Sequence, residues 1–180
     1  MGMATPMRDN EEFASFVHAH ADSLFTTAYL LTGSPGRAEE LLQDTLTRLY
    51  PRWARVTAAD SPTAYVRRSL VNGYITASRK RSTRDLSLSD LPVNSDGRDL
   101  AEEVVDRQLL WQLLRTLPDR QRAALVLRYF HDQPDTEISE ALGCRVSTVR
   151  SLISRGVAAM RETYAHLNHV TPDRPGRTLS

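Results

Sequence analysis

The sequence is poor in the residues that build catalytic and metal centres. Of its 180 residues only Cys144 is a cysteine, so no internal disulfide can form and no thiolate metal set exists. His166 and His169 are spaced to share a helix face but lack a third ligand, and we expect surface histidines there. Glycine-rich phosphate loops, HExxH pairs and GxSxG elbows are missing. The sequence therefore predicts no enzymatic activity, no metal and no cofactor.

Long hydrophobic runs and a strong net charge are missing as well. No apolar run approaches the roughly 18 residues that a membrane span needs, and residues 1–13 lack the basic and apolar segments of an export signal. We therefore expect a cytoplasmic protein without a membrane span. The formal net charge of +1 excludes a bulk polycation, while 41% hydrophobic residues suffice for packed cores.

The charge is unevenly distributed along the chain. Residues 82–105 carry a net charge of −4, are rich in Ser, Asp, Pro and Gly, and show no sustained hydrophobic period. We expect a flexible acidic linker there. It would join two small all-α domains, at 11–81 and 106–165, and residues 166–180 would form a disordered tail.

Three helices are predicted before the linker. The first spans 11–32 and ends at Gly33; Ser34 and Pro35 are an N-cap and first-turn pair for the second, which ends or kinks at Pro51. An irregular segment, 54–60, leads to a third helix capped by Ser61. Its expected inward residues are Tyr65, Val66, Leu70, Tyr74 and Ala77. Its expected outward residues are Arg67, Arg68, Asn72 and Thr76, ahead of Arg79, Lys80 and Arg81.

This third helix interleaves aromatic rings, an amide and arginines. Rings can stack on bases and cations can hold phosphates, so the pattern suits a single-stranded nucleic acid. A solvated basic face is the alternative. The helix alone does not decide between them.

After the linker, leucines at 109, 110, 113, 114 and 117 predict a helix ending near Pro118, and a second helix follows in PDRQRAALVLRYF. Residues 134–161 then read as a helix-turn-helix whose first helix buries Ile138, Ala141 and Leu142 and ends at Gly143. The second helix is expected to turn inward Val146, Val149, Ile153, Val157 and Met160.

The open face of that second helix carries short hydroxyls and arginines and no carboxylate. Small side chains allow close approach to a major groove, while arginine reads guanine edges or holds phosphates. The alternative is an ordinary helical hairpin with solvated arginines. The candidate DNA-reading residues are Arg145, Ser147, Thr148, Arg150, Ser151, Ser154 and Arg155.

The order of these parts resembles the sigma-70 family of bacterial RNA polymerase sigma factors, in its extracytoplasmic-function group. The resemblance rests on five segments in order: FASFVHAHADSLFTTAYLLTG, AEELLQDTLTRLYPRW, AYVRRSLVNGYITASRKR, LLRTLPDRQRAALVLRYF and EISEALGCRVSTVRSLISR. It implies a region 2 that grips the β′ clamp of RNA polymerase core and opens the promoter. It also implies a region 4 that binds the β flap and the minus-35 element.

Residue roles follow from the same resemblance. The clamp-binding stretch would contain Leu41, Gln43, Asp44 and Leu46. The segment 56–64 would form the loop that captures flipped minus-10 bases, with Tyr65, Arg68 and Asn72 beside it. The implied partners are polymerase core, promoter DNA and an anti-sigma factor, without an obligate homo-oligomer.

A conventional helix-turn-helix regulator is the alternative function. Its N-terminal half would be a helical dimerisation or effector domain, and it would bind a symmetric operator as a dimer without polymerase. The basic aromatic helix of the N-terminal half would then have no purpose. Copurification with polymerase core distinguishes the two functions.

Overall fold

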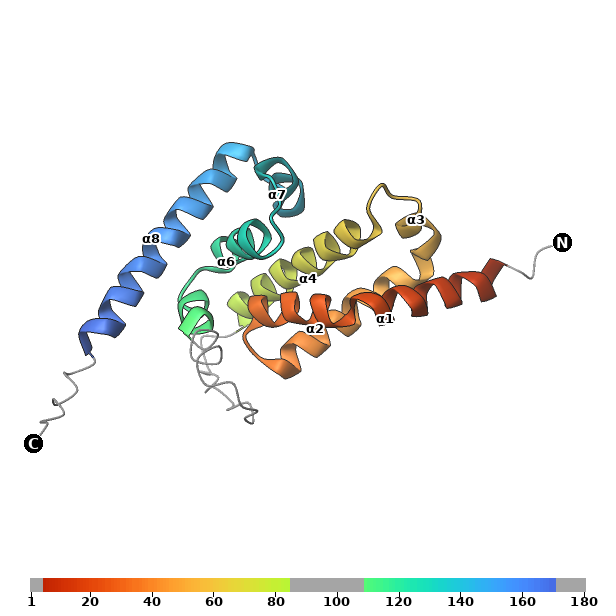
Figure 1. The fold of residues 1–180 in the computed structure, drawn as a ribbon, viewed down its shortest axis with the longest axis horizontal. Coiled ribbons are helices and arrows are strands. Elements are labelled where there is room, and N and C mark those ends of the chain that lie inside the picture. The colour runs from red at the N-terminus through yellow and green to blue at the C-terminus, as the bar shows by residue number, and fades with distance from the viewer. Residues whose placement is uncertain (1–4, 85–108, 171–180) are drawn as a thin grey trace, which may run out of the picture.

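The computed structural model describes residues 5–84 and 109–170, and the side chains of 5–8, 81–84 and 168–170 lie outside that description. All regular elements in the described ranges are helices, which confirms the all-α prediction (Figure 1). The linker was expected at 82–105, but helix α4 (Pro62–Arg84) continues to Arg84, so its first three residues are helical and the prediction is wrong there. The rest of the expected linker, and the expected tail from 171 onward, fall outside the described residues.

The N-terminal half, residues 5–84, is a bundle of α1 (Thr5–Thr32), α2 (Pro35–Leu49) and α4 (Pro62–Arg84). A 3-10 turn (Tyr50–Arg52) and the short α3 (Trp53–Thr57) connect α2 to α4. The expected irregular segment at 54–60 is therefore helical as far as Thr57. Trp53 and Val56, 2% and 0% exposed, pack with Leu24 and Val66, and this burial forms the extra turn.

The two predicted serine caps behave differently. Ser61 accepts a hydrogen bond from the backbone N–H of Ala64 at 3.3 Å, so its prediction is confirmed. Ser34 occupies the N-cap position of α2 but makes no side-chain capping bond, so that part of the prediction is wrong. Its backbone carbonyl accepts from Ala38 N–H at 2.9 Å, which starts the helix without the hydroxyl.

The C-terminal half, residues 109–170, begins with a helical segment at 109–115. It continues through α6 (Asp119–Leu125), the π-helical turn η2 (Val126–Phe130), α7 (Asp135–Leu142) and α8 (Val146–Val170). Gly143 ends α7 in the left-handed conformation, φ 59°, as predicted. The tail was expected to begin at residue 166, and this is wrong for its first five residues, because α8 continues to Val170.

The two halves share one hydrophobic core. Leu70 and Val71 of α4 belong to the same buried cluster as Leu127 and Ile138 of the C-terminal half. Figure 1 shows α6 and α7 lying against α4, with α8 on the outer side. Helix α4 is consequently buried on more than one face, and Ile75 is only 9% exposed.

Candidate nucleic-acid and polymerase interface

The second helix of the helix-turn-helix presents the predicted open face. Val149, fully buried, fixes its inner side, and Gly156 allows close packing on α6, since a Cβ there would lie 2.9 Å from Leu125 Cδ1. All seven predicted DNA-reading residues of this motif are exposed: Arg145, Ser147, Thr148, Arg150, Ser151, Ser154 and Arg155.

Asp135, at the start of α7, holds one of these arginines. Its Oδ2 accepts from Arg150 Nε at 3.1 Å, and its Oδ1 lies 3.8 Å from Arg128 Nη1. The Asp135 side chain is 23% exposed, whereas that of Arg150 is 73% exposed. Binding through Nε leaves the two terminal nitrogens of Arg150 directed away from this contact, the pair that a bidentate contact to guanine uses. Sequence spacing gave no signal for Asp135.

One residue of the predicted nucleic-acid face of α4 already makes a contact within the protein. Arg68 Nη1 lies 3.3 Å from Glu140 Oε2 of α7, while Asn72 is exposed and Tyr65 is half-buried against the N-terminal core. Arg67 was predicted to point outward, and this is wrong. Its Nε is buried without a hydrogen-bond partner, and burial lowers the pKa of the guanidinium.

The prediction for Ala77 is also wrong, because the side chain is exposed rather than inward. Arg79 and Lys80 are exposed near the end of α4, and the side chain of Arg81 lies outside the described residues. These basic residues continue the α4 surface beyond Asn72.

His131 joins the two halves, and sequence reasoning missed it. Its Nε2 lies 2.9 Å from Oγ1 of the buried Thr27 on α1. Desolvation by burial, and then the positive charge of Arg67, lower the pKa of His131 to about 4. The ring is therefore neutral at physiological pH.

The segment expected to capture flipped bases is shorter than 56–64. Val56 is fully buried in α3 and α4 begins at Pro62, so only 58–61 forms a loop. Ala58, Asp60 and Ser61 are exposed there. Core packing of Val56 explains the later start of the loop, and the cap that Ser61 provides for α4 explains its earlier end.

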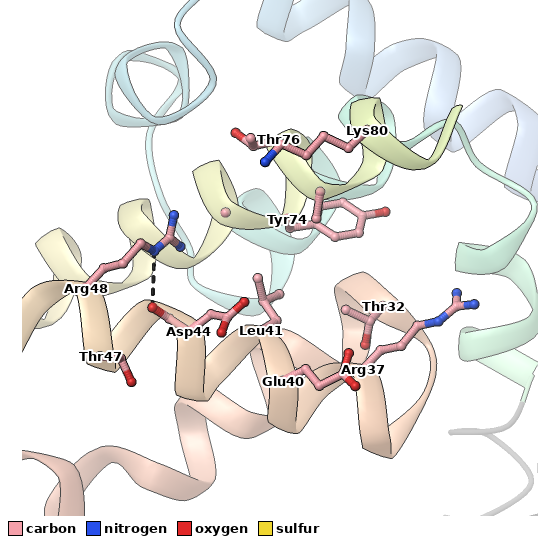
Figure 2. A pocket seen from close by; sticks show the side chains of 12 residues that line it. Thr32, Arg37, Glu40, Leu41, Asp44, Thr47, Arg48, Tyr74, Thr76 and Lys80 are labelled. Atoms are coloured by element: carbon pink, nitrogen blue, oxygen red, sulfur yellow. Dashed lines mark hydrogen bonds between the residues drawn. The ribbon is translucent and has the colours of Figure 1, made fainter. Parts of the chain in front are cut away.

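The predicted clamp-binding stretch lies along α2. Gln43 and Asp44 are exposed, Leu46 is half-buried, and Leu41 is 8% exposed and faces the core. Leu41 also lines a hollow of about 520 Å³ between α2 and α4. Figure 2 shows the charged side chains around this hollow, which are Arg37, Glu40, Asp44 and Arg48 from α2 and Lys80 from α4.

A second hollow, of about 460 Å³, is an apolar groove that the sequence did not reveal. It lies mainly between η2, α8 and the 109–115 segment. Tyr129 and Phe130 on its edge are 68% and 46% exposed. Exposed aromatic rings beside an apolar groove are typical of a surface for a protein partner.

Neither a metal centre nor a membrane segment is present in the described ranges. No three His, Cys, Asp or Glu side chains gather there as metal ligands. No helix within 5–84 or 109–170 has the length and apolarity required to cross a bilayer.

Both halves of the chain match known protein families. Residues 16–84 match the family model for sigma-70 region 2, and residues 107–160 match the model for sigma-70 region 4. The RNA polymerase sigma-E factor of Streptomyces coelicolor is 34% identical over 151 residues, which cover 84% of this chain and 85% of that protein. The ECF RNA polymerase sigma factor SigW of Bacillus subtilis is 27% identical over 169 residues, covering 86% and 89%.

A solved structure agrees in fold. The sigma factor RpoE of Bartonella quintana, in complex with the anti-sigma factor NepR, superposes with a TM-score of 0.65 at 21% identity. The match covers 86% of this chain and 98% of that one. With both halves matched in order, the chain belongs to the sigma-70 family of RNA polymerase sigma factors, in its extracytoplasmic-function group.

Proposed function

We propose that this sigma factor reads the minus-35 element with the exposed face of α8 and captures the melted minus-10 element beside the 58–61 loop. The observation that carries the proposal is the α8 face itself, with seven exposed hydroxyl and arginine residues set above the buried Val149. An exposed basic surface close to a fixed core can enter a major groove without moving the fold.

Region 2 would act on single-stranded DNA. Asn72 and the basic end of α4 are exposed, and Tyr65 lies at the start of the same helix, close to the 58–61 loop. Such a surface stabilises the open promoter because unstacked bases gain contacts that paired bases cannot make. We expect Asn72→Ala to impair open-complex formation more than binding to closed duplex.

Two protein surfaces would anchor the factor to polymerase. Gln43 and Asp44 would contact the β′ clamp, and the apolar groove beside Tyr129 and Phe130 would receive the β flap. The RpoE structure from Bartonella quintana contains the anti-sigma factor NepR, and we propose that a similar partner holds this chain inactive. The factor would act in the cytoplasm by binding alone and would catalyse no reaction.

Run-off transcription with purified polymerase core on genomic fragments tests the proposal. A promoter found in this way is then varied base by base in its upstream element, with Arg150→Ala and Arg155→Ala as the test variants. Loss of one base preference in a variant identifies a base-reading arginine, worth about 1–3 kcal/mol of discrimination. Specific binding to a symmetric operator by dimers without core would instead support a conventional regulator.

A further inference from the structure

The charged hollow between α2 and α4 has the size and the lining of a small-molecule site. Its volume of about 520 Å³ lies within the range of about 300–1,000 Å³ that such sites occupy. Three of its lining side chains are cations, two are carboxylates and three are threonines. This composition suits a ligand that carries both an anionic group and hydrogen-bond donors.

Two small residues of α4 keep the hollow open. A Cβ at Gly73 would lie 2.7 Å from Arg48 Nη2 and 3.2 Å from Leu41 Cδ1, so α2 and α4 touch there. Ala77, one turn further along α4, lines the hollow and is exposed. A larger side chain at position 77 would occupy the space between the two helices.

Arg48 supplies a cation that no carboxylate neutralises. Its Nε donates to the backbone carbonyl of Asp44 at 3.1 Å, and its Nη2 donates to Oγ1 of Thr45 at 3.5 Å. Within residues 5–84 and 109–170 the guanidinium forms no ion pair, although the Asp44 carboxylate lies one turn away on the same helix. Its Nη1 has no partner there and can donate a charge-assisted hydrogen bond to an anion.

Lys80 places a second cation on the α4 side of the hollow. Figure 2 shows its side chain running back along α4 towards Thr76, while the Arg48 guanidinium points from α2 to α4. Arg48 meets α4 at Gly73, and seven residues separate Gly73 from Lys80, which is about 10 Å along the helix. The lysine side chain spans part of this distance. A diphosphate, which has oxygens at both of its ends, can therefore contact both cations.

Glu40 and Asp44 form the opposite wall, on α2. Both side chains are exposed, and neither carboxylate has an ion-pair or hydrogen-bond partner in the part of the chain that the structure describes. A carboxylate repels phosphate but accepts hydrogen bonds from hydroxyl groups, as acidic side chains do from the ribose of bound dinucleotides. The two walls together suit a diphosphate that is linked to a sugar.

We propose that this hollow binds a nucleoside diphosphate. The diphosphate lies on α4 between Arg48 and Lys80, where the Thr76 hydroxyl donates to a phosphate oxygen. The ribose hydroxyls donate to Asp44 and Glu40. Asp44 also belongs to the stretch assigned above to the β′ clamp, so the nucleotide binds the free factor and competes with polymerase core. This competition rests on the proposed function, whereas the binding site does not.

Isothermal titration calorimetry of the full chain without core, with adenosine diphosphate as the titrant, tests the site. We expect Arg48→Gln to weaken binding about tenfold, because it removes a charge-assisted contact to phosphate. Arg52→Gln removes the same charge from an exposed position that does not line the hollow, so it should bind like wild-type protein. Equal affinities of the two variants would overturn the proposal.

A second pair of variants tests the place of the ligand by shape. Ala77→Leu fills the hollow from an exposed position, whereas Ala19→Leu adds the same side chain to an exposed position of α1. Circular dichroism should show that both variants fold, because neither alanine is buried. We expect about tenfold weaker binding for Ala77→Leu only. A folded Ala77→Leu chain that binds as tightly as wild-type protein would contradict the proposed position.

Related titrants distinguish a nucleotide site from a general anion site. Pyrophosphate carries the same diphosphate without the ribose, and we expect it to bind about tenfold more weakly than adenosine diphosphate. Guanosine diphosphate should bind about as tightly as adenosine diphosphate, because the carboxylates contact the ribose and not the base. Pyrophosphate that binds as tightly as the nucleotides, or no binding of any titrant, would refute the proposal.

Competition with polymerase core is measured separately. Saturating adenosine diphosphate should weaken core binding of the wild-type chain about tenfold and leave that of Arg48→Gln unchanged. If the nucleotide binds but core affinity stays the same, the site stands and the assignment of Asp44 to the clamp fails. If no nucleotide binds while replacement of Gln43 and Asp44 weakens core binding, the site fails alone.

Discussion

Acidification should weaken the contact between the two domains through His131. The hydroxyl of Thr27 donates its hydrogen to the carbonyl of Ser23 at 2.7 Å, so its oxygen accepts from the Nε2–H of His131 at 2.9 Å. This geometry requires a proton on Nε2, which both the neutral Nε2–H tautomer and the protonated ring carry. Burial and the nearby Arg67 cation oppose a second proton and lower the pKa of His131 to about 4.

The sign and size of the effect follow from that pKa. In the opened or unfolded chain the ring has its ordinary pKa of about 6.5 and binds a proton first as the pH falls. The stabilisation is thus complete above about pH 6.5 and is lost as the pH falls towards about 4. The full difference corresponds to about 3 kcal/mol, and solvent around the half-buried ring reduces it to roughly half.

The assay is urea unfolding of the full chain at about pH 7.5 and about pH 5.5, where we expect wild-type protein to lose about 1 kcal/mol through this residue. His131→Gln keeps an N–H donor but does not titrate, so its free energy of unfolding should fall less over this range. His166→Gln, on the exposed end of α8, should behave like wild-type protein. Identical pH dependence in wild-type protein and His131→Gln would refute the reasoning.

Three further predictions concern the assigned surfaces. Asp135→Asn should release Arg150 and reduce base discrimination in the upstream element several-fold, measured as in the single-base panel; an unchanged preference would mean that Asp135 does not position the arginine. Replacing Gln43 and Asp44 together by alanine should weaken binding to polymerase core while circular dichroism stays unchanged, and unaltered core affinity would contradict the clamp assignment. Val149→Ala should lower the free energy of unfolding by about 1–3 kcal/mol in a denaturant titration, because the residue is fully buried.

The hydrophobic periodicity of the sequence was sufficient to predict the helix-turn-helix. Its inward positions were spaced by three and four residues, and Gly143 was placed where the left-handed conformation is needed. The exposed face followed directly, because a residue outside the apolar stripe of a surface helix meets solvent. Local pattern and tertiary packing agree in this motif, so prediction from sequence succeeds.

The burial pattern of helix α4 shows why the contacts between the two halves could not be predicted from the sequence. A single inward stripe was assumed, but the helix is packed by its own bundle and by region 4, so Val71 and Ile75 are buried outside that stripe. The same packing buries the Nε of Arg67 and pairs the half-exposed Arg68 with Glu140. Their burial depends on a segment more than forty residues away, which no local period contains. Val71 and Ile75, two β-branched apolar residues on the face expected to be polar, were the sequence feature that could have indicated this second buried face.

The second buried face of α4 also determines the free energy needed to separate the two halves of the chain. Val71 and Ile75 lie on the same side of the helix as Arg68, at spacings of three and seven residues, so they are exposed when region 4 leaves. Exposing one such side chain fully costs about 1.5–3 kcal/mol, and Leu127 and Ile138 on the facing domain add to this. Opening the free chain therefore costs several kcal/mol, which thermal motion seldom supplies. A surface that holds the two halves apart must therefore either cover these apolar residues or bind both halves tightly enough to offset their exposure.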